Sequence, residues 1–474
     1  MMTAARASIR GVDDLRGRRA VVLGLARSGV AASRFLADAG AIVAAYDRRP
    51  AAELAEAVAS LGARPVHLAL GIDPVIAGEL LARADLLVTS PSVSARFPTT
   101  DPWLRDALRA AEARGADVLS EVELFLRLTA ARILAVTGTK GKTTTASLVA
   151  AMLERGGMSH VLGGNIGTPL VERSLELGPE TWAVLELSEL QLPTISRGAD
   201  VALYTNVTQD HLDRHGSVEA YRAVKARLAE LRPPAGWVVL NHDDPGCRSI
   251  GEALDPARTA WYGHSAPGRG GVEAWVSDDG QVIVGGAAVI GSASVPLPGR
   301  HMLANVLCAA LGATLVGVEP DAIAAAVAGF RGVPHRLETV GERGGIRFVN
   351  DSQATVPQAA IAALEAFEAP VVLIAGGKDK GLDYAGFADA IARHARAAIL
   401  IGETADQLAA LIGGRTPLER AADMASAVAS AAALARPGDV VLLSPAAASF
   451  DMFADYAARG DAFRAAVAEL GVDA

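Results

Sequence analysis

The sequence predicts an α/β protein of three domains, each built on a mostly parallel β-sheet. With 474 residues, the chain is too long for one typical domain. The same local order occurs three times along it: a short apolar segment, a glycine-rich turn and an alanine-rich segment of helical character. Continuous apolar strands that alternate with helices are typical of parallel sheets covered by helices on both faces.

The three units lie far apart in the chain. They are Arg19-Ala-Val-Val-Leu-Gly-Leu-Ala-Arg-Ser-Gly29 with a helix through Leu36, Ile133-Leu-Ala-Val-Thr-Gly-Thr-Lys-Gly-Lys-Thr143 with a helix through Leu153, and Val371-Val-Leu-Ile-Ala-Gly-Gly377 followed by Lys378-Asp-Lys-Gly381. Each turn is expected at the carboxyl end of its strand, where open α/β sheets bind ligands.

Breaker residues predict the domain boundaries. We expect the first domain over residues 1–121, ending near Ser120-Glu121 ahead of the second apolar strand. The central domain is expected over 122–332, up to the breaker cluster Gly332-Val333-Pro334, and the third over 333–474. The strand-like segments 237–240 and 281–284 are assigned to the far part of the central domain.

Composition limits the classes of function. Hydrophobic residues make up 51% of the chain and charged residues 20%, which suits several packed cores and not a disordered protein. The formal net charge of −9 argues against nucleic-acid binding, which needs a basic face. Cys247 and Cys308 lie in separate segments, so neither a disulfide framework nor a cysteine metal site is expected. No run approaches the ~18 apolar residues of a membrane span, and Met1–Leu15 lacks the apolar stretch of a signal peptide. We therefore expect a cytoplasmic protein without a membrane or nucleic-acid partner.

The strongest local motif is Gly138-Thr-Lys-Gly-Lys-Thr-Thr144, between the second apolar strand and its helix. Backbone N–H groups of such a turn and the N-terminus of the following helix face a bound phosphate. Lys142 can reach the β- and γ-phosphates, and the Thr143 hydroxyl can bind magnesium. The general pattern has a glycine at the position of Val136, so this is the shorter form. The alternative is a helix N-terminus with an incidental lysine. The motif predicts a nucleotide site and a central domain like those of P-loop ATPases, between Rossmann-like N-terminal and C-terminal domains.

Polar residues follow two further apolar strands of the central domain. Residues 183–191 expose Glu186 and Ser188 at their polar end, and residues 202–211 end in Asn206, Asp210 and His211. A carboxylate such as Glu186 suits magnesium, which takes one or two protein carboxylates together with phosphate oxygens. From chemistry alone, His211 can be either a ligand or a turn-capping group.

At this point the motifs resemble those of the Mur ligases of peptidoglycan synthesis, in order and over essentially the whole chain. The matching segments are Thr137-Gly-Thr-Lys-Gly-Lys-Thr-Thr144, Gly163-Gly-Asn-Ile-Gly167, Leu185-Glu-Leu-Ser-x-x-Gln-Leu192, Asn206-Val-Thr-x-Asp-His211, Tyr221-Arg-Ala-x-Lys225, Pro334-His-Arg336, Asn350-Asp-Ser-x-Ala-Thr355, Gly376-Gly377 with Lys380, and Leu443-Ser-Pro-Ala-x-Ala-Ser449. Within that family, the last motifs look most like members that add D-glutamate to UDP-N-acetylmuramoyl-L-alanine. The resemblance implies ATP and Mg²⁺ as cofactors, an acyl-phosphate intermediate and domain closure around the substrates. We expect a monomer.

The resemblance also implies roles for individual residues. Thr143 and Glu186 would hold one magnesium, and His211 a second together with Lys225, whose family counterpart is carbamylated. The ATP-binding residues would be Gly138, Thr139, Lys140, Gly141, Lys142, Thr143, Thr144, Asn305, Arg336 and Asp351. Asn165 and Ser188 would contact the muramoyl-alanine end of the substrate, and Lys380, Ser449 and Tyr456 the incoming glutamate.

The first glycine turn, Gly24-Leu-Ala-Arg-Ser-Gly29, is an incomplete dinucleotide fingerprint with Ala26 in place of the middle glycine. Asp47 closes the next strand at a spacing that suits a ribose contact, so a nicotinamide-dependent oxidoreductase is the alternative function from another class. The resemblance implies instead that Ala26, Arg27 and Ser28 bind the diphosphate of a UDP-substrate, with Asp47 and Arg49 near uracil and Ser90 completing the pocket.

The sequence departs from the family pattern at several positions. Gln353 stands where a lysine is usual and Val356 where an asparagine is usual, in a segment on the glutamate side. Glu189 adds a carboxylate where a second serine is usual, and Lys140 replaces an asparagine. We expect D-glutamate as the acceptor, with L-glutamate as the alternative.

Overall fold

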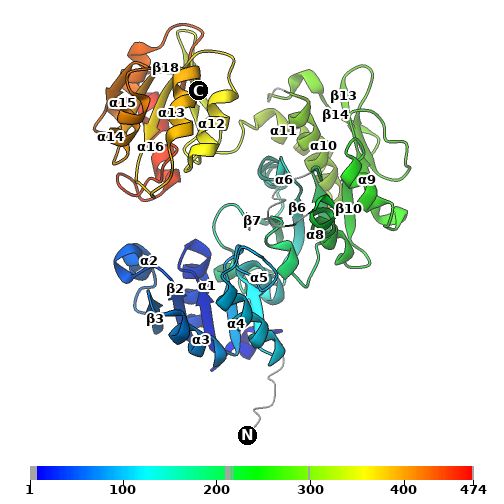
Figure 1. Cartoon of the computed structure of the whole chain (residues 1–474). Helices are drawn as coiled ribbons and strands as arrows, with labels where there is room; N and C mark the ends of the chain where they lie inside the picture. The colour runs from blue at the N-terminus through cyan, green and yellow to red at the C-terminus, as the bar shows by residue number, and fades with distance from the viewer. Residues whose placement is uncertain (1–7, 209–214, 216, 297–298, 472–474) are drawn as a thin grey trace. The chain divides into compact units, whose positions relative to one another are not determined.

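The structure, a computed structural model, confirms the α/β fold and its three sheets (Figure 1). It describes residues 8–208, 215, 217–296 and 299–471. The chain separates into two compact units that meet in the sequence at Phe330 and Arg331. The first unit contains the N-terminal and central sheets, and the second contains the C-terminal sheet.

The N-terminal sheet is fully parallel, in the order β3-β2-β1-β4-β5. Its strands are β1 (Arg19–Leu23), β2 (Ile42–Asp47), β3 (Val66–Leu70), β4 (Leu86–Thr89) and β5 (Asp117–Ser120), and its helices are α1 (Arg27–Asp38), α2 (Ala55–Ser60), α3 (Pro74–Ala82), α4 (Pro102–Ala113) and α5 (Glu121–Leu128). Alternate residues of β1 face opposite ways: Val22 packs in the cluster with α1 and α5, and Val21 in the cluster with α3 and α4. Both faces are therefore covered, as a Rossmann-like domain requires.

The central sheet has the order β14-β13-β12-β11-β10-β9-β6-β8-β7 and is parallel from β7 to β12. Its strands are β6 (Arg132–Thr137), β7 (His160–Gly164), β8 (Trp182–Glu186), β9 (Val201–Tyr204), β10 (Trp237–Asn241), β11 (Thr259–Tyr262), β12 (Glu273–Val276), β13 (Gln281–Val284) and β14 (Ala287–Gly291). Its helices are α6 (Lys142–Arg155), α8 (Val218–Glu230), α9 (Pro245–Gly251), α10 (Arg300–Leu315) and α11 (Pro320–Gly329). The strand-like segments 237–240 and 281–284 lie in β10 and β13, and the antiparallel β12–β14 meander extends the sheet.

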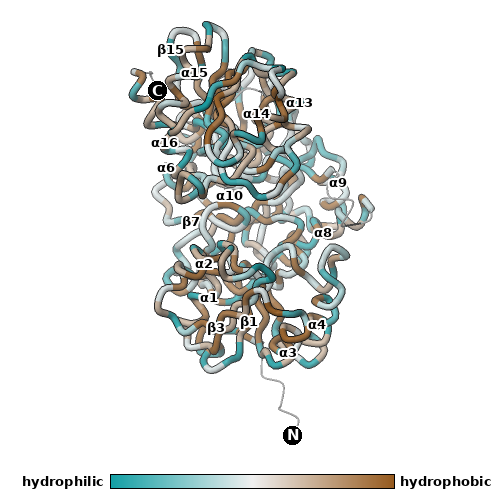
Figure 2. Tube along the Cα trace, turned by 60° about the vertical axis from the view of Figure 1, so that its left-hand side comes forward, coloured by the Kyte–Doolittle hydropathy of each residue, from teal (hydrophilic) through white to brown (hydrophobic). Residues whose placement is uncertain are grey.

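One hydrophobic cluster crosses from the N-terminal sheet into the central domain. It includes Leu36 of α1, Phe125 of α5 and Leu185 of β8, each less than 2% exposed. The opposite face of the central sheet packs against α6, α10 and α11. In Figure 2 the brown, hydrophobic parts of the trace concentrate in the strands and the teal parts in the connecting loops. The N-terminal and central sheets therefore share a continuous core within one compact unit.

The C-terminal sheet has the order β15-β16-β20-β17-β18-β19, with only the β15–β16 pair antiparallel. Its strands are β15 (Glu338–Arg343), β16 (Ile346–Asn350), β17 (Val371–Gly376), β18 (Ala395–Ile401), β19 (Leu418–Arg420) and β20 (Val440–Leu443), and its helices are α12 (Pro357–Glu365), α13 (Ala385–His394), α14 (Ala405–Ile412), α15 (Met424–Leu434) and α16 (Tyr456–Glu469). Helices α12, α13 and α14 share one core cluster with the sheet, and α15 and α16 share the other.

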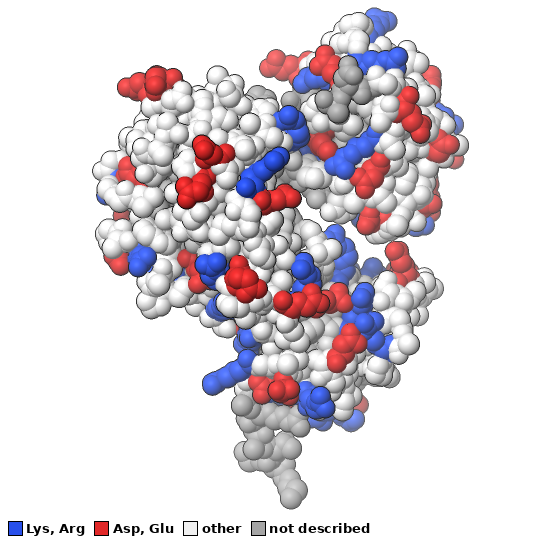
Figure 3. Space-filling view, turned by 180° about the vertical axis from the view of Figure 1, so that it is seen from behind, with Lys and Arg blue, Asp and Glu red and all other residues white. Residues whose placement is uncertain are grey.

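Within the described residues, every helix is too short or too polar to cross a membrane. On the face shown in Figure 3, lysine and arginine are interspersed with aspartate and glutamate.

Candidate active site

The phosphate loop forms a tight turn between β6 and α6. Gly138 has a φ of 143° and Gly141 a φ of 85°, conformations that favour glycine. A Cβ atom at Gly138 would lie 2.0 Å from Thr205 Oγ1, and one at Gly141 would lie 2.4 Å from Asn305 Oδ1. Both glycines are therefore required by close contacts as well as by backbone conformation. Asn305, on α10, therefore lies against the loop.

Neighbouring strand ends hold the loop in shape. The Thr205 hydroxyl, just after β9, donates to the Lys140 carbonyl oxygen at 2.6 Å. The Lys140 N–H donates to Asn206 Oδ1 at 3.0 Å. Lys142, the first residue of α6, bends back so that its Nζ donates to the Thr139 carbonyl oxygen at 2.9 Å. The lysine head therefore lies over the turn, where an anion bound by the loop would meet it.

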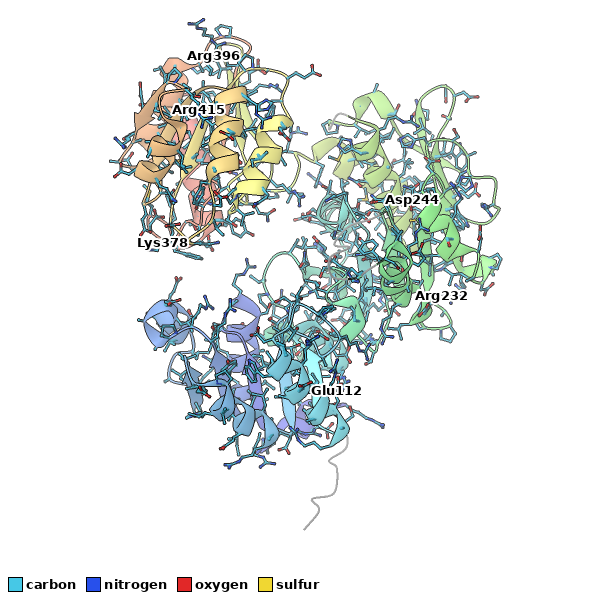
Figure 4. The ribbon with its side chains drawn as sticks, viewed as in Figure 1. Glu112, Arg232, Asp244, Lys378, Arg396 and Arg415 are labelled. Carbon is cyan, nitrogen blue, oxygen red and sulfur yellow. The ribbon has the colours of Figure 1, made fainter. Side chains whose placement is uncertain are left out.

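Asp244 fixes the segment that follows β9. It caps α9 by accepting the Cys247 N–H at 2.8 Å, and the same oxygen accepts the Val207 N–H at 2.9 Å. Figure 4 labels this residue in the central domain. The helix cap and the chain that supports the phosphate loop therefore share one carboxylate.

Glu186 lies at the carboxyl end of β8, beside β6, and is only 2% exposed. The Thr143 hydroxyl donates to its Oε2 at 2.8 Å, and the Asn165 amide donates to its Oε1 at 3.0 Å. The structure thus brings Thr143 and Glu186, which the family resemblance pairs as ligands of one magnesium, together with Asn165, to which it gives a different role. A carboxylate and a hydroxyl beside a phosphate loop are oxygen ligands of the kind that Mg²⁺ uses with phosphate oxygens, so these residues fit that ion. Thr144 follows in the first turn of α6.

Lys225 is fully buried on α8, next to the same loop. Its Nζ lies 3.3 Å from Thr137 Oγ1 and 3.8 Å from Glu189 Oε2. The ring centroid of Tyr221 is 5.5 Å from Nζ, and the Tyr221 hydroxyl is 3.0 Å from Thr139 Oγ1. Lys225 therefore belongs to the surroundings of the phosphate loop, which its position on a helix did not indicate by itself.

His211, predicted to hold the second magnesium, lies outside the described residues, as does Asp210. Ser188 is buried and forms a local turn, in which its N–H and its hydroxyl both donate to Gln191 Oε1 at 3.0 Å.

The turn after β1 has the tight helix–strand contact of a dinucleotide fingerprint. A Cβ at Gly29 would lie 1.8 Å from the Gly24 carbonyl oxygen. Asp47 accepts the Leu25 N–H at 2.9 Å and pairs with the Arg49 guanidinium at 2.9 Å. Burial would raise the pKa of Asp47, but the hydrogen bonds from Arg49 and Leu25 outweigh it and lower this pKa to about 2. Asp47 thus supports the turn from below with both of its oxygens bonded.

A pocket opens at this edge of the N-terminal sheet. Its lining includes Asp47, Arg49 and Ser90, which the sequence predicted, together with Arg48, Tyr46 and Trp103, which it did not. The Tyr46 and Trp103 rings pack edge to face with centroids 6.1 Å apart. The only sequence signal for Trp103 was a tryptophan in a chain with 4% aromatic residues.

A second pocket lies between the N-terminal turn and the glycine-rich segment after β7. It is lined by Arg27, Ser28, Asn165 and Gln191, among others. The Arg27 guanidinium donates to the Gly167 carbonyl oxygen, which ties the two turns together. Ala26 is the N-cap of α1 and is exposed beside Arg27. Arg27 and Ser28, predicted to bind the diphosphate, and Asn165, predicted to contact the muramoyl-alanine end, therefore line one pocket of the first unit.

In the C-terminal unit, Asp351 follows β16 and is 6% exposed. It accepts the Ser444 hydroxyl at 2.8 Å and the Leu337 N–H at 3.2 Å. Burial raises the pKa of Asp351 to about 6, against the lowering effect of these hydrogen bonds and of Arg336. His335 and Leu337, on either side of the exposed Arg336, both have positive φ, which fixes the direction in which this arginine leaves the chain.

Arg459 is a site residue that the sequence did not indicate. It is 1% exposed and donates to the Ser352 carbonyl oxygen at 2.8 Å and to the Ala447 and Ala448 carbonyl oxygens at 3.0 Å. It thereby joins the segment 350–355 to the segment 443–449. Burial lowers the pKa of Arg459 to about 10. Arg459 is one of two arginines on α16, and nothing in the sequence of this helix distinguishes it for this role.

Two of the predicted glutamate-binding residues, Ser449 and Tyr456, precede Arg459 by a few residues in the sequence, and the third, Lys380, is near enough to be affected by its charge. Ser449 is 2% exposed, and its Oγ has no hydrogen-bond partner among the residues that the structure describes. Partial burial and then the Arg459 charge lower the pKa of Lys380, although its side chain as a whole is exposed. Tyr456 begins α16, and its carbonyl oxygen accepts the Ser352 hydroxyl at 2.7 Å.

Comparison with known proteins gives consistent matches. Residues 136–313 match the family described as Mur ligase middle domain, and residues 335–447 match Mur ligase, glutamate ligase domain. The chain is 41% identical over 452 residues to the UDP-N-acetylmuramoylalanine–D-glutamate ligase of Solibacter usitatus, covering 95% of this chain and 97% of that protein. It is 40% identical over 471 residues to the enzyme of the same name from Pelotomaculum thermopropionicum, covering 97% and 99%. The solved UDP-N-acetylmuramate-alanine ligase of Thermotoga maritima covers 96% of this chain and 100% of its own, with a TM-score of 0.53 and 16% identity, and so shares its fold.

Proposed function

Because the chain belongs to the Mur ligase family, we propose that it is an ATP-dependent ligase that joins D-glutamate to UDP-N-acetylmuramoyl-L-alanine in peptidoglycan synthesis. The observation that supports this most directly is the cluster of Thr143, Glu186 and Asn165 beside Lys142 and the phosphate loop. It combines a phosphate cradle with a buried carboxylate, which phosphoryl transfer requires.

The chemistry follows from the poor reactivity of a carboxylate toward an amine. Transfer of the γ-phosphoryl group of ATP to the alanyl carboxylate gives an acyl phosphate and ADP. The amine of glutamate then attacks the acyl carbon, the carbon–oxygen bond to phosphate breaks, and the amine loses a proton. Lys142 and the N–H groups of the loop offset negative charge on the transferring phosphoryl oxygens. Thr143 and Glu186 would hold Mg²⁺, which adds positive charge at those oxygens when bound.

The remaining assignments extend this proposal to the substrates. ATP would be bound by Gly138, Thr139, Lys140, Gly141, Thr144, Asn305, Arg336 and Asp351. The UDP-substrate would be bound at its diphosphate by Ala26, Arg27 and Ser28, on its uracil side by Asp47, Arg49 and Ser90, and at its muramoyl-alanine end by Asn165 and Ser188. Glutamate would be bound by Lys380, Ser449 and Tyr456. The bonded state of Asp47 gives it a supporting position under the turn. The buried Ser449 hydroxyl has no hydrogen-bond partner among the described residues, and a ligand that reached it would supply one. We further propose a cytoplasmic monomer with domains over 1–121, 122–332 and 333–474.

The nicotinamide alternative has less support. Its fingerprint is incomplete, with Ala26 in place of the middle glycine. That alternative also assigns no role to Lys142, Thr143 or Glu186.

The test is phosphate release by the purified protein with ATP, Mg²⁺ and UDP-N-acetylmuramoyl-L-alanine, with D-glutamate and L-glutamate in parallel and the product identified by mass. We expect release and product with D-glutamate. Product with L-glutamate alone would keep the mechanism and change the acceptor, which would direct attention to Gln353 and Val356. Failure to form product with either isomer would refute the proposed ligation.

A further inference from the structure

The pocket that contains Asp47, Arg49 and Ser90 in its lining, here called the edge pocket, opens where the strand order of the N-terminal sheet reverses. The chain passes from β1 to β2 on one side of β1, and it later places β4 on the other side. The edge pocket has a volume of about 580 Å³ and lies at the carboxyl ends of β1, β2 and β4, next to Gly24, Asp47 and Ser90. Open α/β sheets bind ligands at such a point, and this volume is in the range of small-molecule sites.

The pocket lined by Asn165, here called the Asn165 pocket, adjoins the edge pocket along two segments of the chain. Gly24 lines the edge pocket, and Arg27 and Ser28, further along the same turn, line the Asn165 pocket. The second junction is at residues 90 and 91, of which the first lines the edge pocket and the next lines the Asn165 pocket. The two pockets therefore meet at the N-terminus of α1, where a diphosphate is favoured.

Trp103 supplies an aromatic wall of the edge pocket. It lies in the first turn of α4, is half-buried, and packs against the hydrophobic cluster that includes Leu104 and Leu108. The Tyr46 ring meets it edge to face, with ring centroids 6.1 Å apart and an angle of 85° between the ring planes. In such a pair the rings do not stack on each other, so at least one face of the indole is left uncovered by Tyr46. The indole is thus held in place on its buried side while its exposed part lines the pocket.

We propose that Trp103 is the residue on which the uracil ring of the UDP-substrate stacks. The inference rests on the proposed function for the identity of the substrate. With the diphosphate at the N-terminus of α1 and the muramoyl-alanine end at Asn165, the nucleoside enters the edge pocket. Uracil is the aromatic part of this substrate, and aromatic side chains bind bases by stacking. Because uracil takes no part in the reaction, stacking stabilises the bound substrate and the transition state equally, so Trp103 acts on KM and not on kcat.

The first test is a titration of the full-length protein with UDP, followed by tryptophan fluorescence with excitation at the red edge of the indole band, where uracil does not absorb. We expect UDP to quench the emission of the unsubstituted protein, because a stacked base quenches the indole against which it lies. Trp103→Phe keeps an aromatic face, so it should retain UDP binding in calorimetry and lose most of the quenching. Equal quenching in the unsubstituted protein and in Trp103→Phe, or absence of UDP binding, would overturn the inference.

The second test separates stacking from a structural role. Trp103→Leu removes the aromatic face and keeps an apolar side chain against the cluster. It should raise the Kd for UDP and the KM for the UDP-substrate ~10-fold and change kcat less than ~2-fold, and Trp103→Phe should restore both constants. The matched control Trp275→Leu changes a half-buried tryptophan on β12, outside both pockets, and should retain the parental KM and the UDP-dependent quenching. A fall in kcat at unchanged KM in Trp103→Leu would contradict stacking.

This inference and the proposed function fail in different ways. Absence of ligation by the unsubstituted protein would refute the proposed function, and the UDP titration would still decide whether a base stacks on Trp103. Ligation with a UDP response that does not depend on Trp103 would refute the stacking alone.

Discussion

The turns after β1 and β6 share one backbone plan and differ in the side chains around it. Each connects a buried parallel strand to a helix through glycines that leave no room for a Cβ, at Gly29 in the first and at Gly138 and Gly141 in the second. The first turn has a carboxylate beneath it, with Asp47 accepting the Leu25 N–H. The second has Lys142 over it and Glu186 beside it, bonded to Thr143.

This difference distinguishes a turn that can bind an anion from a turn that can also support phosphoryl transfer. A glycine turn at a helix N-terminus attracts an anion in either place, because N–H groups and the helix dipole do so without side chains. Phosphoryl transfer needs, in addition, a mobile cation and oxygen ligands for a metal. In the second turn Lys142 and the Thr143–Glu186 pair can supply them. In the first turn Arg27 is bonded to Gly167 and Asp47 is paired with Arg49, so the second turn suits a reacting triphosphate and the first a bound diphosphate.

The largest expected effect is on the cation of the second turn. Lys142→Ala should reduce kcat at least ~10³-fold, because a charge aimed at the transferring phosphoryl group is lost. The melting temperature should stay within a few degrees, since the bond from the side chain to the Thr139 carbonyl oxygen is local to the loop. Phosphate release and thermal unfolding measure both. Arg155→Ala, at the other end of α6, is the matched control and should retain full activity. A fully active Lys142→Ala protein would remove the distinction between the turns.

The carboxylate of the second turn should rank next. Glu186→Gln keeps a hydrogen-bond acceptor for Thr143 and removes the negative charge, so we expect kcat to fall ~10²-fold and the Mg²⁺ concentration for half-maximal rate to rise. A magnesium titration of initial rates checks this, with the exposed Glu154→Gln as control. An unchanged magnesium requirement would argue that Glu186 only orders Thr143 and Asn165.

Gly29→Ala tests the packing of the first turn. The new Cβ would lie 1.8 Å from the Gly24 carbonyl oxygen, so strand and helix must separate. We expect roughly 3 kcal/mol of destabilisation in urea unfolding and weaker binding of the UDP-substrate. Gly78→Ala, in α3 with nothing within 4 Å, is the control and should be neutral or stabilising by ~0.5 kcal/mol. Equal stability of the two variants would show that the first turn tolerates expansion.

The smallest effect concerns Asp47. Its pKa of about 2 in the folded protein lies below the ordinary value of 3.8, so its contribution to stability is present above pH ~4 and is lost as the pH falls toward 2. Asp47→Asn should cost roughly 1–2 kcal/mol at neutral pH, and the gap between variant and parent should close in acid. Thermal unfolding from pH 7 to pH 2 measures this. A gap that stays constant with pH would mean that the charge of Asp47 does not support the turn.

Much of this architecture was predictable because it is local. The apolar runs at 19–23, 133–137 and 371–376 are strands in the structure, and the glycine turns follow them as expected. For the antiparallel β12–β14 meander, the sequence predicted strand-like segments but not the direction of their pairing. That direction depends on where the chain reverses, which composition does not specify. Arg459 was missed because an arginine in a helix is usually exposed at the surface and seldom buried in a core.

By itself, the sequence determined the strand–turn–helix units, the phosphate loop and the set of residues able to bind phosphate and magnesium, because these depend on neighbouring residues and on backbone sterics. The tertiary structure decided which of those groups already have partners. Asp47 is bonded under its turn, Ser449 is buried without a partner among the described residues, and Glu189 faces Lys225 across 36 positions of sequence. The physical reason is that the charge and availability of a buried group depend on burial and on partners brought together by the packing of distant elements.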